Sequence, residues 1–256
     1  MNKIVLGNEN ASICLIQAVD EHDASFLTSE YEIITDLSGR TDILLVALQV
    51  SDWNHDLSPW KAPAVFGKED FGDGAEKTLS YIEEELLPDI HKKYDRGTEG
   101  TPCIIGGYSM SGLFALWASC QSSAFCACAA ASPSVWFPGW MDYVEANMPK
   151  AKHVYLSLGD KEEKTKNPVM RTVADCIRTQ HNLLRDSGIN SILEWNPGNH
   201  FRDADLRMAK AFAWCIRQPC NGIAVDPEYQ KPVSNMQQAE KVLKADDFSF
   251  PKARVK

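Results

Sequence analysis

Residues 101–118 read Thr-Pro-Cys-Ile-Ile-Gly-Gly-Tyr-Ser-Met-Ser-Gly-Leu-Phe-Ala-Leu-Trp-Ala. A short apolar run ends in two glycines, a lone serine follows at position 109, and the residues after it repeat with a helical apolar pattern. The segment therefore predicts a strand, a sharp turn with Ser109 at its apex, and a helix.

Ser109 occupies the serine position of a nucleophile elbow, Gly-x-Ser-x-Gly. Such a turn strains the backbone of the serine and leaves no room for side chains two residues to either side. The earlier position is Gly107, and the later one is Ser111, a small residue in place of the usual glycine. Ser111 is the weaker candidate nucleophile, because its own second neighbour is the bulky Leu113. A plain Gly/Ser-rich connection is the alternative explanation, so partners elsewhere in the chain have to complete the case.

The size and charge of the chain limit the classes of function. Its 256 residues suffice for one large α/β domain, and 44% hydrophobic and 24% charged residues are typical of a globular protein. A formal net charge of −9 argues against a nucleic-acid or anionic-membrane surface. No stretch is long enough to span a bilayer, and the N-terminus lacks the apolar core of a secretory signal. We therefore expect a cytoplasmic protein with no nucleic-acid or membrane partner.

Eight cysteines are present, most of them in apolar surroundings. No Cys-x-x-Cys pair or Cys/His cluster has the spacing of zinc ligands, so we expect no metal site. Buried, reduced thiols that serve as small hydrophobic side chains are expected, rather than disulfides.

Apolar runs typical of buried strands alternate with helical patterns between residues 12 and 217. The clearest strands are expected at residues 12–19, 42–50, 103–105, 125–130, 153–158 and 191–195. The alternation predicts an α/β fold with a largely parallel sheet covered on both faces. A helix beginning near Gly74 contains Pro88, where we expect a kink or a break. We expect one domain over residues 1–220 and a peripheral polar tail over 221–256, with room for a short helix near 237–244.

Catalytic groups of such sheets gather on loops at the carboxyl ends of the strands. Ser109 satisfies this condition, and so does His200, which follows the strand at 191–195 in a Pro-Gly-Asn-His turn and suits a general base. The imidazole needs a carboxylate to fix its tautomer, and the loop after residue 158 offers Asp160, Glu162 and Glu163. The residues alone do not choose among these three. The chain order of serine, acid and histidine is that of α/β-hydrolases.

A tetrahedral intermediate at Ser109 would need hydrogen-bond donors for its negative oxygen. The backbone N–H of Met110, at the start of the predicted helix, is one candidate. We expect the second from the loop after the strand at 42–50, around Trp53 or Asn54. The side chains of that loop also suit packing or a substrate pocket.

With these residues placed, the chain resembles the esterase family of α/β-hydrolases that includes D-type esterases, feruloyl esterases and iron-siderophore esterases. The resemblance spans roughly residues 12–217 and rests on five segments: Asp-Trp-Asn-His-Asp-Leu-Ser-Pro-Trp at 52–60, Gly-Gly-Tyr-Ser-Met-Ser-Gly at 106–112, Ala-Ser-Pro-Ser-Val-Trp at 131–136, Ser-Leu-Gly-Asp-Lys-Glu-Glu at 157–163 and Gly-Asn-His-Phe at 198–201. It implies an α/β-hydrolase fold, with little room for a separate cap domain.

The resemblance also implies roles for residues. The nucleophile falls on Ser109, the base on His200, and the acid on Glu162, with Asp160 as the alternative. It implies no metal and no organic cofactor. Loops 51–74 and 131–140 would shape the pocket, with Asn54, Trp60 and Trp136 among its residues, and their aromatic side chains favour an apolar or aromatic substrate group.

We therefore expect a serine hydrolase that cleaves a small-molecule carboxylic ester through an acyl-enzyme. An acyltransferase with the same triad and a non-catalytic, hydrolase-like binding protein are the alternatives. The sequence names neither the ester nor the oligomeric state, and a homo-oligomer stays open.

Overall fold

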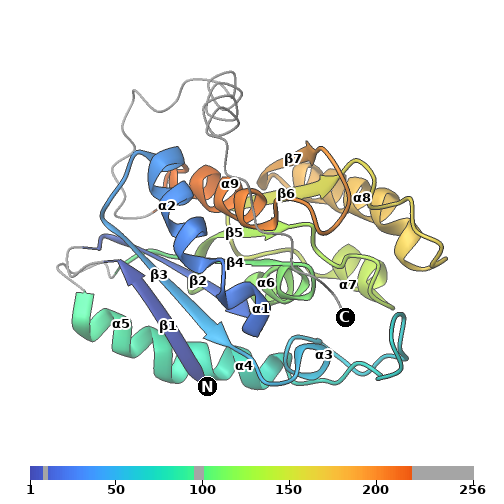
Figure 1. The fold of residues 1–256 in the computed structure, drawn as a ribbon, viewed down its shortest axis with the longest axis horizontal. Helices are drawn as coiled ribbons and strands as arrows, with labels where there is room; N and C mark the ends of the chain where they lie inside the picture. The colour runs from blue at the N-terminus through green and yellow to red at the C-terminus, as the bar shows by residue number, and fades with distance from the viewer. Residues whose placement is uncertain (8–10, 95–100, 221–256) are drawn as a thin grey trace, which may run out of the picture.

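One sheet forms the centre of the part of the chain that the computed structural model describes, residues 1–7, 11–94 and 101–220. Its order is β1-β3-β2-β4-β5-β6-β7 (Figure 1). β1 pairs antiparallel with β3, and the other neighbouring pairs are parallel. The strands are β1 Asn2–Gly7, β2 Ile13–Val19, β3 Ile43–Gln49, β4 Cys103–Tyr108, β5 Phe125–Ala131, β6 His153–Gly159 and β7 Asn190–Asn196.

Helical segments connect the strands and cover both faces of the sheet (Figure 1). They are α1 Glu21–Ala24, α2 Leu27–Ser38, α3 Trp53–Asp56, α4 Ala75–Tyr81, the π-helical η1 Ile82–Leu86, α5 Leu87–Tyr94, α6 Met110–Gln121, α7 Trp140–Ala146, the 3-10 turn η2 Met170–Thr172, α8 Val173–Asp186 and α9 Ala204–Ile216. The α/β architecture expected from the alternating patterns is confirmed, and no separate cap domain interrupts the described residues.

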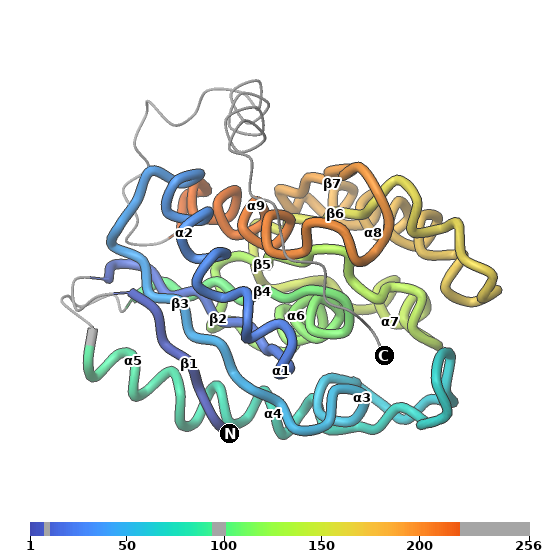
Figure 2. Tube along the Cα trace, in the orientation of Figure 1, coloured from blue at the N-terminus to red at the C-terminus, as the bar shows by residue number. Residues whose placement is uncertain are grey.

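The core consists of two apolar layers, one on each face of the sheet. In β2 every residue is buried, and successive side chains point to opposite faces: Ile13 and Leu15 to one layer, Cys14 and Ile16 to the other. α2 and α9, which lie side by side, supply the first layer (Figure 2). Helices α4 to α8 supply the second.

Two elements differ from the sequence expectations. β1 was not predicted, because an edge strand with one neighbour alternates between exposed and half-buried residues and shows only a short apolar run. The helix of residues 75–94 neither breaks nor ends at Pro88. A π-helical turn, η1, directly precedes α5, which contains Pro88 as its second residue. The wider turn of η1 accommodates Pro88, which has no N–H to donate within the helix.

The expectation of reduced thiols throughout is wrong at one pair. Cys126, near the start of β5, forms a disulfide with Cys220, which follows α9. The two cysteines are 94 residues apart in sequence, so no local motif announces the bond. Six other cysteines are free thiols, and all but Cys176 are buried, as expected.

The expected tail at 221–256, including the helix near 237–244, lies outside the described residues. Among the residues that are described, no helix has both the length and the apolar character needed to cross a membrane.

Candidate active site

Ser109 lies at the apex of the turn between β4 and α6. Its backbone has φ 59° and ψ −121°, a region that non-glycine residues rarely occupy, so the serine is held in a strained conformation. Its N–H donates to the Ala131 carbonyl at 3.2 Å, and its own carbonyl accepts from the Ser134 N–H at 3.0 Å. The end of β5 and the loop that follows therefore hold the strained turn in place.

Small residues around Ser109 are required by contact distances. A Cβ atom at Gly107 would lie 2.2 Å from Ser111 Oγ and 2.4 Å from the Ser111 carbonyl carbon. One at Gly112 would lie 2.9 Å from the Gly107 carbonyl oxygen. Ser111 itself fits because its buried hydroxyl donates to the Ala18 carbonyl at 2.8 Å and ties the elbow to β2. That bond also directs the Ser111 hydroxyl away from a nucleophilic role.

His200 and Glu162 come together with Ser109 from separate loops. His200 Nε2 lies 3.0 Å from Ser109 Oγ, and His200 Nδ1 lies 2.7 Å from Glu162 Oε2. The carboxylate accepts the Nδ1 proton, which leaves Nε2 free to accept the proton of the serine hydroxyl. The three residues that the sequence placed at strand ends thus form one continuous line of hydrogen bonds.

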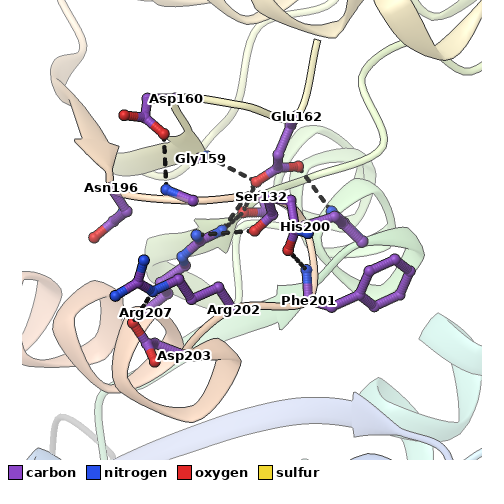
Figure 3. Close-up of polar contacts among 12 residues, drawn as sticks. Ser132, Gly159, Asp160, Glu162, Asn196, His200, Phe201, Arg202, Asp203 and Arg207 are labelled. Carbon is purple, nitrogen blue, oxygen red and sulfur yellow. Dashed lines mark hydrogen bonds and ion pairs between the residues drawn. The ribbon is translucent and has the colours of Figure 1, made fainter. Parts of the chain in front are cut away.

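The Oε1 atom of Glu162, which does not face His200, accepts hydrogen bonds from three donors (Figure 3). Oε1 accepts from the Ser132 hydroxyl and the Gly159 N–H, each at 2.7 Å, and from Arg207 Nη1 at 3.0 Å. Burial by itself raises the pKa of Glu162, but the hydrogen bonds and charge of His200, with the Ser132 and Gly159 donors, outweigh burial and hold the pKa below its ordinary value. Glu162 is therefore an ionised carboxylate in the neutral range.

Asp160, the alternative acid, has a different contact. Its Oδ1 accepts the Gly198 N–H at 2.7 Å, and its own N–H donates to the Asn196 carbonyl at 2.8 Å (Figure 3). Asp160 thus bonds to the turn that carries His200, while Glu162 bonds to the imidazole itself.

The backbone donors expected for an oxyanion lie at two helix starts. Met110 is the first residue of α6, where a helical N–H has no acceptor within its own helix. Trp53 and Asn54 are the first two residues of α3. In that short helix the Asp52 side chain accepts from the His55 N–H, and the Asp52 carbonyl accepts from the Asp56 N–H, so the early N–H groups of Trp53 and Asn54 are not used by this cap.

The aromatic residues expected in the pocket form a packed cluster. Trp60 donates from Nε1 to the Pro138 carbonyl at 2.9 Å and contacts the rings of Phe137 and Trp140. Trp136 contacts Phe66, whose side chain is exposed. These contacts show packing between loops 51–74 and 131–140, and a role in binding substrate stays a prediction for Asn54, Trp60 and Trp136.

Sequence reasoning missed the residues that contact Glu162 and the backbone of His200. Ser132, at φ 44°, donates to Glu162, and Tyr108 donates from its hydroxyl to the His200 carbonyl at 2.7 Å. Arg207 comes from the buried face of α9. A sequence signal for it existed, since Arg207 and Lys210 are cations three residues apart in a run, 206–216, whose other residues are apolar. In the described ranges, no cluster of three or more His, Cys, Asp or Glu side chains could hold a metal ion.

Solved structures similar to this chain share its fold. A siderophore hydrolase from Aspergillus nidulans matches with a TM-score of 0.64 and 17% identity over 81% of this chain and 83% of its own. An IroE-like serine hydrolase from Shewanella oneidensis matches with a TM-score of 0.67 and 15% identity over 95% of this chain and 82% of its own. The enterobactin esterase FES from Shigella flexneri matches with a TM-score of 0.58 and 14% identity over 82% of this chain and 54% of its own.

The sequence also matches a protein-family model. The search of curated proteins found no match to this chain. The family model described as "Putative esterase" covers residues 28–203, more than half of the chain and all of the segment that carries Ser109, Glu162 and His200. The chain therefore belongs to this esterase family of α/β-hydrolases, whose members are carboxylic ester hydrolases.

Proposed function

We propose that the protein hydrolyses a small-molecule carboxylic ester through a covalent acyl-enzyme, with Ser109 as nucleophile, His200 as general base and Glu162 as the acid of the triad. The observation that carries the proposal is the pair of contacts from Ser109 Oγ to His200 Nε2 at 3.0 Å and from His200 Nδ1 to Glu162 Oε2 at 2.7 Å. These distances are those of a nucleophile, its base and the group that orients the base.

In the first half of the reaction, Ser109 Oγ attacks the ester carbonyl carbon and its proton passes to His200 Nε2. The imidazolium that forms is stabilised by the Glu162 carboxylate, and the Met110 N–H, with a second donor at Trp53, binds the oxyanion. Collapse of the intermediate breaks the bond to the alcohol oxygen, which takes the proton from His200. Water, deprotonated by His200, then attacks the acyl carbon. The bond to Ser109 Oγ breaks, His200 returns the proton to Oγ, and the carboxylic acid is released.

The fold neighbours suggest which esters to try first. Two of the three structures described above are named as a siderophore hydrolase and an enterobactin esterase. Together with the aromatic side chains of loops 51–74 and 131–140, this favours siderophore esters and other esters with aryl groups as substrates of this chain. A panel of short acyl, long acyl and aryl esters ranks these classes by kcat/KM.

An acyltransferase would use the same triad with an alcohol or amine in place of water. Product analysis by mass spectrometry separates the two, because hydrolysis releases the free acid and transfer yields a new ester or amide. The contact between Ser109 and His200 supports both enzymes over a non-catalytic binding protein.

The first experiment is labelling with a fluorophosphonate probe, combined with turnover of p-nitrophenyl esters. Wild type should be labelled on Ser109 and turn over the esters, and Ser109→Ala should do neither. Ser111→Ala is the matched control: its hydroxyl is also on the elbow but bonds to the Ala18 carbonyl, so this variant should still label on Ser109. A folded wild type without label or turnover would refute the proposal.

A further inference from the structure

We propose that Arg207 is the positioning residue of the Glu162–His200 pair, a role that rests on the proposed function of the triad. The Arg207 side chain is 1% exposed, and Figure 3 shows it pointing toward the Glu162 carboxylate and Ser132. A guanidinium removed from water to this extent requires acceptors for its protons and a counter-charge. The segments that carry the triad supply the counter-charge and the acceptors for the Nη protons, whereas Nε has no partner within the described residues.

The guanidinium contacts four separate segments of the site. Nη1 donates to Glu162 Oε1 at 3.0 Å, to the Tyr108 hydroxyl at 3.1 Å and to Ser132 Oγ at 3.2 Å. Nη2 donates to the carbonyls of Pro197 and Asn199, at 3.1 and 3.0 Å. One side chain therefore joins the acid, the residue before the nucleophile and the turn before the base.

The hydrogen bonds of Arg207 hold the backbone of His200 at two points. Asn199, whose carbonyl accepts from Nη2, directly precedes His200. Tyr108, which accepts from Nη1, donates in turn to the His200 carbonyl at 2.7 Å. The backbone of the base is thus held from both sides through Arg207, while the imidazole is held by Glu162.

A planar fork is required for this set of contacts. Arginine directs its Nη1 and Nη2 protons to different acceptors in a fixed geometry, whereas a lysine ammonium is a single point at the end of a flexible chain. Arg207→Lys preserves the charge but reaches only part of the set. It therefore separates the geometric contribution from the electrostatic one.

The charge has a second consequence, for protonation of the base. A positive guanidinium on Oε1 of Glu162 offsets part of the attraction that the carboxylate exerts on an imidazolium at Oε2. Removing the charge favours the imidazolium, which cannot act as a base. As the pH is lowered, the variant should therefore lose activity sooner than wild type does. The substitution leaves the other charged or titratable groups near Glu162 and His200 unchanged. These are Asp160, which bonds to the turn before His200, Tyr108 on β4, Asp23 of α1, the Arg202–Asp203 pair and the Lys210–Glu194 pair.

Lys210 provides a matched control on the same helix. Its side chain is 6% exposed, and it pairs with Glu194 at 3.0 Å and with Asn196 Oδ1 at 3.2 Å. It is one helical turn from Arg207 and is also buried and ion-paired, but Glu194 and Asn196 are not members of the triad. Lys210→Met therefore reports what deletion of a buried cation of α9 does to the protein in general.

The experiment measures kcat and KM from pH 5 to 9, with melting temperature and fluorophosphonate labelling, for wild type, Arg207→Lys, Arg207→Met and Lys210→Met. We expect kcat of Arg207→Lys to fall by about 100-fold with an unmoved acid limb, since a shift of the base by about 1 Å costs that much. In Arg207→Met, kcat should fall at least as far and the acid limb of kcat/KM should move up by roughly one pH unit. Lys210→Met should lose stability while kcat and the limb stay those of wild type.

Full kcat in Arg207→Lys, or an equal loss of kcat in Lys210→Met, would overturn the inference. Should Arg207→Met not fold, Tyr108→Phe decides, because it breaks the path from Arg207 to the His200 carbonyl and should lower kcat without moving the acid limb; unchanged kcat there overturns the proposal. Failure of the triad itself would look different, since wild type would then show neither turnover nor label on Ser109.

Discussion

At the scale of single residues, two carboxylates two positions apart have separate contacts. Glu162 meets His200 Nδ1, and Asp160 accepts the Gly198 N–H. The sequence located both on the correct loop, because loops at the carboxyl ends of parallel strands converge. It did not separate them by pattern, because the choice depends on how the loop turns back after Gly159, where the Glu162 carboxylate bonds to the Gly159 N–H.

We predict that the two carboxylates respond differently to amide substitution. Glu162→Gln should lower kcat by about 10³-fold or more, because an amide does not stabilise the imidazolium and can impose the wrong tautomer on His200. Asp160→Asn keeps an oxygen acceptor for the Gly198 N–H and should stay within about tenfold of wild type. Steady-state kinetics on a p-nitrophenyl ester measure both. A larger loss in Asp160→Asn than in Glu162→Gln would exchange their roles.

The elbow glycine gives a prediction on stability. Gly107→Ala places a methyl group within 2.4 Å of the Ser111 backbone, which cannot move without disturbing Ser109. We expect a loss of about 1–3 kcal/mol in the free energy of unfolding, together with loss of labelling at Ser109. Gly67→Ala is the comparison variant, since no atom lies within 4 Å of an added Cβ there and any cost comes from its positive φ of 68°. Urea unfolding compares the two, and equal losses would contradict the steric argument.

At the scale of secondary-structure elements, buried apolar runs were the reliable signal. β2 to β6 and α6 lie where the sequence placed them, because each is almost fully buried and its apolar residues leave a clear pattern. β1 and η1 were missed for the opposite reason. An edge strand needs few apolar residues, and a π-turn depends on the geometry of the backbone before Pro88 rather than on any residue type.

The packing of α2 on β2 buries a carboxyl that predicts a pH dependence of stability. Gln17 Nε2 donates to Glu30 Oε1 at 2.9 Å, and burial raises the pKa of Glu30 to about 8. The folded protein therefore holds this proton more tightly than the unfolded chain does. Its contribution to stability is complete at low pH and is lost as the pH rises from the ordinary pKa of about 4.5 to about 8.

We predict that Glu30→Gln flattens this dependence. In wild type, this group should lower the free energy of unfolding by up to about 1.4 kcal/mol per pH unit across that window. Glutamine carries no titrating proton, so the variant should gain stability relative to wild type as the pH approaches 8. Glu32→Gln, on the exposed side of the same helix, is the control. Urea unfolding at pH 5.5, 7 and 8.5 tests this, and parallel curves for wild type and Glu30→Gln would contradict it.

At the scale of the whole molecule, the disulfide connects the two ends of the described C-terminal half. Cys126 lies near the amino end of β5, whereas Ser109 and His200 follow the carboxyl ends of β4 and β7. In this parallel part of the sheet, the disulfide therefore lies at the opposite end of the strands from Ser109 and His200. Disulfides are typical of oxidising compartments. The redox state of this pair in the cell therefore tests the predicted cytoplasmic location.

We predict that Cys220→Ser lowers stability and leaves catalysis unchanged. A native disulfide typically contributes about 2–4 kcal/mol. The melting temperature should fall accordingly, whereas kcat should match wild type, because the bond does not contact the triad. Cys176→Ser, which removes a free thiol, is the control for the substitution itself. A drop in kcat with unchanged melting temperature would contradict this assignment.

The same bond determines what a protease would release. Glu162 and His200 lie within the segment that Cys126 and Cys220 close, and Ser109 lies before it. A single cut in the exposed stretch around Pro168 would divide the backbone between acid and base, yet both pieces would stay in one molecule. Such a nicked protein would run as one band on a non-reducing gel and as two bands after reduction. Ser109, Glu162 and His200 would stay in one molecule until a reductant cleaves the disulfide.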